Sequence, residues 1–233
     1  MRSLLLSRSA RAHLLLLAVV IVWGATFVLV KDALADISPL LFNLLRMAIA
    51  TVALAAIYHR QIRHLRRAHL VAGAVVGFCL ALGYQFQTAG LARTTPAKSA
   101  FITGLVVVLV PLLSAVPVLR ARGMHGPGWH AVTGAVIAFG GIVLLTTPAH
   151  TPWRSIFATI NTGDWLTLGC AFGFALHMLA LAHYSPRTPL AALAVLQLGA
   201  CTVFMSISLP IFEHPFLHTS MRLLAALLIA ALL

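Results

Sequence analysis

Long, uninterrupted apolar runs alternate with short polar connections along the whole chain. Runs long enough to cross a hydrocarbon core of about 30 Å lie at 13–31, 39–58, 69–91, 99–119, 130–147, 165–183 and 189–211, and another begins near Leu223. The runs are continuous and lack the alternation of barrel strands, so helices are the spanning elements they favour. The pattern predicts an all-α, polytopic helical bundle in a membrane.

The composition agrees with a membrane protein. Hydrophobic residues make up 61% of the chain and charged residues 9%, against about 45–50% and about 25% in ordinary globular domains. Ten of the 16 Lys and Arg residues lie in the N-terminal segment and in the connections after the second, fourth and sixth runs, whereas all four acids lie in the opposite connections. The net charge of +12 is therefore a topology signal and not a sign of nucleic-acid binding.

This charge distribution predicts an orientation. Basic residues concentrate in the cytoplasmic loops of membrane proteins, so the N-terminal segment 1–12 and the basic stretch at 59–67 are predicted to be cytoplasmic. A bacterial inner membrane is the expected location, with membrane lipid as the surroundings.

Neither a metal site nor an enzyme is expected. Cys79, Cys170 and Cys201 lie inside apolar runs without ligand spacing. No Walker loop, nucleophile elbow, zinc-protease motif or dinucleotide fingerprint occurs. We predict no metal, no cofactor and no catalytic residue.

A weak internal repeat divides the chain. An offset of 149–151 positions aligns Trp23-Gly24 with Phe172-Gly173 and Arg46 with Gln197. Five spans in a unit would force the two units into opposite orientations. We therefore predict a cytoplasmic segment 1–12, a first repeat 13–147, an external linker 148–163 and an incomplete second repeat 164–233 with spans six, seven and the start of eight.

Several stretches resemble a known family. These are WGATFVLVK (23–31), RMAIATVAL (46–54), ALGYQFQTAGLARTTPAKSAFITGLVVVLVPLLSA (81–115) and GDWLTLGCAFGFALHMLALAHYSPR (163–187). Together they resemble the EamA-type branch of the drug/metabolite transporter superfamily over 13–211. The resemblance implies two inverted five-helix repeats, alternating access and export of a small metabolite such as an amino acid.

Two features depart from the family pattern. The segment 119–123 lacks the acid usual there, and helices nine and ten are absent from this sequence. A truncated, non-transporting copy and a membrane enzyme or assembly factor that acts on lipid-linked substrates are therefore the alternative readings. A small-molecule substrate is expected as a partner, with a homodimer as one option for assembly.

Arg46 is the leading candidate for substrate binding. It follows Pro39 by seven residues, which places it about 10 Å below the outer end of its helix, on one face with Asn43. A charge at that depth is costly and needs a partner or a purpose. Either Arg46 receives a carboxylate or phosphate of the substrate, or it is a structural arginine bonded to Asp32, Asp36 or loop carbonyls.

Other polar residues within the spans are candidates for a substrate pathway. His177, near the middle of its span, is also a proton-coupling candidate, because histidine changes charge near neutral pH. Pro111 is expected to kink the fourth span. No acid lies deep in any span, which favours a neutral, zwitterionic or anionic substrate. The remaining candidates are Trp23, Thr26, Tyr84, Gln85, Gln87, Thr88, Ser99, Thr103 and Gln197.

Overall fold

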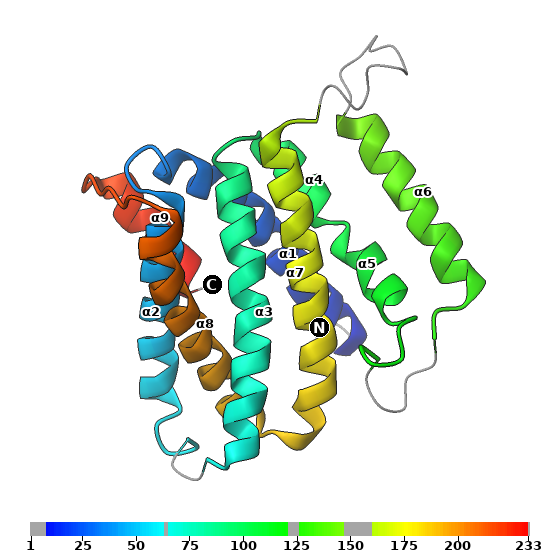
Figure 1. Cartoon of the computed structure of the whole chain (residues 1–233), viewed down its shortest axis with the longest axis horizontal. Helices are drawn as coiled ribbons and strands as arrows, with labels where there is room; N and C mark the ends of the chain where they lie inside the picture. Colours follow the sequence, from blue (N-terminus) through cyan, green and yellow to red (C-terminus); the bar gives the residue numbers. More distant parts are fainter. Residues whose placement is uncertain (1–7, 63–64, 121–125, 147–159, 233) are drawn as a thin grey trace, which may run out of the picture.

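The computed structural model describes residues 8–62, 65–120, 126–146 and 160–232, and in that part the regular elements are helices (Figure 1). A 3-10 turn at Ser185–Arg187 joins the seventh and eighth. The helices are α1 (Arg8–Ala33), α2 (Pro39–Ile57), α3 (Arg67–Leu91), α4 (Pro96–Thr103), α5 (Val106–Leu113), α6 (Trp129–Thr146), α7 (Thr162–Tyr184), α8 (Leu190–Phe212) and α9 (Met221–Leu232).

Six stretches among the described residues are long and apolar enough to cross a membrane. They correspond to α1, α2, α3, the pair α4–α5, α7 and α8. The predicted fifth span forms α6, which ends next to the undescribed residues 147–159, and α9 is a shorter apolar helix. The predicted polytopic helical membrane bundle is confirmed.

Local sequence signals place the starts of several helices. Pro96 occupies the first turn of α4, and the Thr95 hydroxyl accepts a bond from the Lys98 amide at 3.3 Å. At α7, Asn161 and Asp164 form a reciprocal capping box. Most of the predicted linker 148–163 lies outside the described residues.

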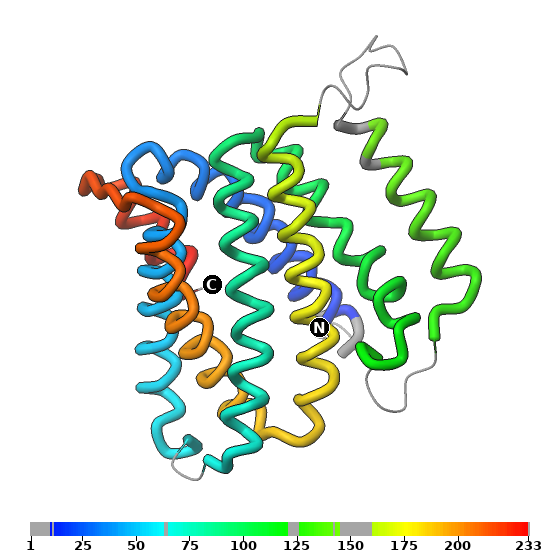
Figure 2. The backbone as a smooth tube through the Cα atoms, in the orientation of Figure 1, coloured from blue at the N-terminus to red at the C-terminus, as the bar shows by residue number. Residues whose placement is uncertain are grey.

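The helix α3 stands at the centre of the bundle. It packs most extensively against α7 and α8, while α8 also packs against α2 (Figures 1 and 2). Glycines permit the close α3–α7 approach: a Cβ atom on Gly173 would lie 2.7 Å from the backbone nitrogen of Gly83, and one on Gly90 would lie 2.8 Å from the carbonyl oxygen of Gly163. Larger side chains at these positions would force the helices apart.

The contacts of α3 have a counterpart in the contacts of α9. The third span, α3, packs against α7 and α8, and α9 packs against α1 and α2. At the contact of α2 with α8, the Thr51 and Thr202 hydroxyls are 3.1 Å apart, and these residues differ by 151 positions, as Arg46 and Gln197 do. Contact between equivalent positions is expected where a pseudo-two-fold axis passes between two repeats.

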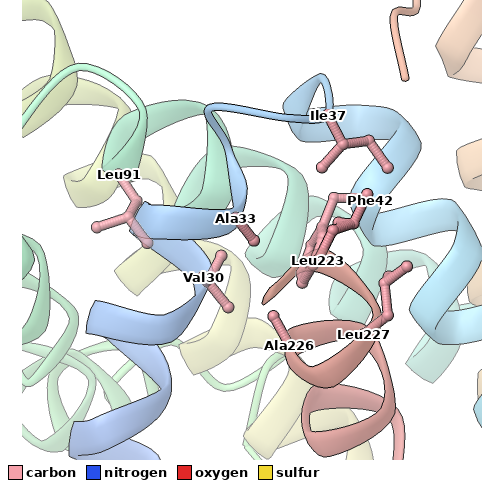
Figure 3. Close-up of a cluster of buried hydrophobic side chains, with 8 residues drawn as sticks. All are labelled: Val30, Ala33, Ile37, Phe42, Leu91, Leu223, Ala226 and Leu227. Atoms are coloured by element: carbon pink, nitrogen blue, oxygen red, sulfur yellow. The ribbon is translucent and has the colours of Figure 1, made fainter. Parts of the chain in front are cut away.

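A buried cluster joins the ends of four helices on one side of the bundle (Figure 3). Val30 and Ala33 come from α1, Phe42 from α2, Leu91 from α3 and Leu223 from α9. This cluster anchors α1, whose earlier apolar residues between 14 and 21 are mostly exposed. In a membrane these exposed side chains contact lipid or other spans.

The expected fourth span requires a correction. The helix breaks at Gly104 and Leu105, where the amides of Leu105, Val107 and Val108 bond to carbonyls three residues back; the kink expected at Pro111 stays a prediction. Glycine is a poor helix former, whereas Pro111 lies inside α5. The span also ends at Leu113, six residues before the predicted limit of 119, in a series of turns.

Candidate functional site

Arg46 is buried inside the bundle without a carboxylate partner. Its side chain is 6% exposed, and its Nε and Nη2 atoms have no hydrogen-bond partner. The ion pairs among the described residues are Lys98–Asp164 and Arg222–Asp36. The expected alternative, a structural arginine bonded through these atoms to Asp32, Asp36 or loop carbonyls, is therefore not what the structure contains.

Aromatic rings supply the contacts that Arg46 does have. Its guanidinium carbon lies 4.0 Å from the centre of the Tyr84 ring and 5.7 Å from that of Phe42. The Tyr84 ring in turn packs edge-on against Phe174 of α7, with centroids 5.0 Å apart. Stacking of this kind attracts the cation to the ring face and leaves the in-plane N–H groups free to bind.

Asn43 and Thr88 fix α2 to α3 beside this arginine. The fully buried Asn43 amide donates to the Tyr84 carbonyl at 2.9 Å and accepts from the Thr88 hydroxyl at 2.9 Å. The bond from Asn43 fixes the backbone of Tyr84, and with it the position of the ring that stacks on Arg46. Asn43, Arg46, Tyr84 and Thr88, all predicted from sequence, are thus brought together.

A small pocket lies between α1, α2 and α3 at Arg46. It has a volume of about 20 Å³, and Arg46 contributes to its wall together with residues of α1 and α3. That space accommodates one water molecule or the oxygen end of a ligand. The other lining residues are Thr26, Phe27, Val30, Gln87, Thr88 and Leu91.

A second cluster of polar side chains lies where α8 contacts α7 and α3. The His177 Nε2 atom is 3.1 Å from the Gln197 side-chain oxygen, so this nitrogen donates, and the buried Nδ1 atom has no partner. The Gln85 amide donates to the Ser208 hydroxyl. These contacts place His177, Gln197 and Gln85 at helix interfaces, while the proton-coupling role of His177 stays a prediction.

The other candidates do not join either group. Ser99 lies 3.5 Å from Thr167, measured between hydroxyl oxygens. The Thr103 hydroxyl is 3.7 Å from the sulfur of Cys170, and both contacts connect α4 with α7. Two more candidates stand apart, because Trp23 is 58% exposed on α1 and Pro111 lies inside α5 with its carbonyl accepting from the Ser114 hydroxyl.

A polar network ties the α1–α2 connection to the α8–α9 connection. Both Asp36 carboxylate oxygens bind Arg222, at 2.6 and 2.7 Å, and Ser220 donates to the same group. An antiparallel bridge pairs Ile37 with Leu217. The hydrogen bond from Arg222 holds the pKa of Asp36 well below its usual range, with a further lowering from Ser220.

Glu213 adds a second connection at this end. Its carboxylate accepts the backbone N–H groups of Leu40 and Leu41 at 3.1–3.3 Å and so caps α2, whose Ser38 makes no side-chain cap. The Asp164 carboxylate of α7 accepts from the Thr94 hydroxyl and the Lys98 ammonium group, and so ties α7 to the start of α4. Sequence reasoning placed these acids on one side without predicting their partners.

Comparison with known proteins places the chain in a class. The model of the EamA-like transporter family matches residues 10–147. This chain belongs to the EamA-like transporter family, and it is an integral membrane protein.

A particular relative comes from Archaeoglobus fulgidus and is described as an uncharacterized transporter. It is 31% identical over 220 residues, which cover 94% of this chain and 64% of the relative. The chain thus spans less than two thirds of the length of the protein it matches. The comparison with solved structures found no match.

Proposed function

We propose that this protein is a secondary transporter that exports a small metabolite across a bacterial-type inner membrane by alternating access. The observation that carries the proposal is the buried, always charged Arg46, which has two unpartnered donors and contributes to the wall of a small pocket. Ionisable residues in spans are expensive and mark substrate pathways. Family membership supports transport as the general activity.

Alternating access is supported by the exchange of contacts between the two halves. The contact of Thr51 with Thr202 lies where an axis between α2 and α8 would pass. Rocking of one half about such an axis would expose the Arg46 pocket alternately to each side. His177 and Gln197, at the interface of α7 and α8, would then change their environment during the movement.

We further propose that the described conformation is closed at its outer end. The Asp36–Arg222 pair, the Ile37–Leu217 bridge and Glu213 join segments of the two halves there. At the opposite end, the hydrogen bonds of the described residues 58–62 and 114–120 reach no farther than the end of the helix that precedes each segment. Outward opening would require the network at the outer end to break.

Transport in vesicles tests the proposal. The purified chain is reconstituted into lipid vesicles, the vesicles are loaded with a panel of labelled carboxylates, amino acids and sugars, and efflux of each compound is followed. We expect one class to leave faster than from protein-free vesicles, with loss of the excess in Arg46→Ala and no loss in Arg93→Ala, because Arg93 is exposed and binds its own helix at Ala89. Equal efflux in the two variants would reject the proposed site.

Orientation is tested separately by labelling single cysteines introduced into a cysteine-free chain. We expect a cysteine at position 60 to react only with permeant reagents in intact cells, and one at position 214 to react with impermeant reagents. The reverse result would contradict the proposed cytoplasmic N-terminus.

A further inference from the structure

The two free donors of Arg46 form one edge of its guanidinium group. Nε and Nη2 carry N–H bonds that point in nearly the same direction, so together they can grip two oxygen atoms of one ligand. Both atoms are buried and unpartnered, and the residue as a whole is 6% exposed. Leaving such donors unsatisfied is costly, which indicates that a ligand completes them.

The same molecule shows what this edge binds. In the Arg222–Asp36 pair, Nε contacts one carboxylate oxygen at 2.6 Å and Nη2 contacts the other at 2.7 Å. A planar carboxylate therefore matches the edge that Arg46 presents. The difference is that the protein supplies the carboxylate to Arg222 and none to Arg46.

Charge balance restricts the ligand further. The chain has four acids, and none lines the pocket. Asp36, Asp164 and Glu213 are engaged at the outer end, and Asp32 is exposed. A single negative charge would neutralise the site, whereas an ammonium group on the ligand would find no carboxylate to bind and would be repelled by the arginine.

The other residues that line the Arg46 pocket favour an apolar carbon chain next to the carboxylate of the ligand. Val30 of α1 and Leu91 of α3, both labelled in Figure 3, line the pocket together with Phe27. Thr26 and Gln87 add neutral hydrogen-bonding groups. The pocket holds at most the oxygen end of the ligand, so the carbon chain of the ligand must extend beyond it. An apolar surface around few polar groups is usual for small-molecule sites.

We propose that Arg46 and its pocket bind the carboxylate of a small organic monoanion in preference to a zwitterionic amino acid. This inference rests on the proposed transport function for its biological purpose, but the binding step can be measured without transport. Neither family membership nor the description of the relative specifies a substrate class.

Calorimetric titration of the purified full chain in detergent at neutral pH tests the inference. The probes share one carbon skeleton: butanoate, butanamide and 2-aminobutanoate, with inorganic phosphate as a tetrahedral anion and oleate as a lipid-derived carboxylate. We expect butanoate to bind at least about tenfold more tightly than the amide, the amino acid and phosphate, a discrimination within reach of one charge-assisted pair.

Three variants complete the test. Arg46→Met should remove butanoate binding, and Arg46→Lys should weaken it at least about tenfold, because an ammonium group cannot grip both oxygens. Arg93→Met, which removes an exposed arginine, should bind as the unchanged protein does. The amide comparison on the unchanged protein needs no variant and guards against misfolding.

Each other result overturns the inference. No butanoate binding, equal binding of 2-aminobutanoate, tighter binding of phosphate or oleate, or unchanged binding in Arg46→Met would each do so. Selective binding without efflux from vesicles would leave this site standing and reject the transport proposal, so the two failures are distinguishable.

Discussion

Replacing Arg46 by methionine should stabilise the empty protein, which is unusual for a buried residue. Methionine keeps an unbranched apolar stem of similar length, so packing against Phe42 and Tyr84 is largely retained. What disappears is a charge whose Nε and Nη2 donors have no partner. Removing an uncompensated buried charge relieves its desolvation cost.

The expected gain follows from two opposing contributions. A cation within a span costs about 2.5–3.5 kcal/mol at the helix centre, and Arg46 lies about 10 Å from the N-terminal end of α2, so the lower value applies. The stacking on Tyr84, at 4.0 Å, returns about 0.5–2 kcal/mol. The net stabilisation is about 0.5–2 kcal/mol, which corresponds to a rise in Tm of about 1–8 °C in a chain of this size.

Thermal unfolding in detergent without ligand, followed by tryptophan fluorescence, measures this change. Arg222→Met is the matched comparison, because it leaves Asp36 without its partner and should lower Tm. Opposite signs for the same substitution at the two arginines would support the reasoning. A fall in Tm for Arg46→Met would refute it, since Arg46 would then hold a stabilising partner.

Three further predictions concern packing and charge. Cysteines at Thr51 and Thr202, whose hydroxyls are 3.1 Å apart, should form a disulfide on mild oxidation, seen as altered gel mobility; free thiols after oxidation would contradict the α2–α8 contact. Gly173→Ala should destabilise the protein by about 1–3 kcal/mol in denaturant unfolding because its Cβ meets the α3 backbone, whereas Gly140→Ala, with open space around it, should not. The folded pKa of Asp36 is lowered, so the stabilisation from its carboxylate is fully present above the unfolded pKa of about 3.9 and is lost only as pH falls through the folded pKa. Asp36→Asn should therefore reduce Tm by the same amount from pH 8 to pH 5. A reduction that disappears by pH 5 would refute this.

The spans could be predicted from sequence because their signal is local. A run such as 189–211 has enough apolar residues to cross a membrane by itself, and the structure places α8 at Leu190–Phe212. The break in the fourth span at Gly104 was not predicted. Proline is a strong local signal, but the turn at Gly104 depends on weaker preferences combined with packing against neighbouring helices.

The candidate site was predictable in part. Asn43 and Arg46 share a helical face, so their proximity follows from spacing within one helix. Thr51 and Thr202 were missed, although their separation of 151 positions equals the repeat offset and could have indicated a contact. No local pattern distinguishes Trp23, which is exposed on α1, from an inward-facing tryptophan.

The sequence by itself determined that this protein lies in a lipid bilayer, that it is helical and how deep Arg46 lies, because hydrophobicity and helix rise are properties of single segments. Only the tertiary structure decided which acid meets which base. Asp36 binds Arg222, 186 positions away, and this leaves Arg46 without a carboxylate. Pairing of that kind depends on how separate helices pack, since each charge binds whichever partner the fold brings within hydrogen-bonding distance.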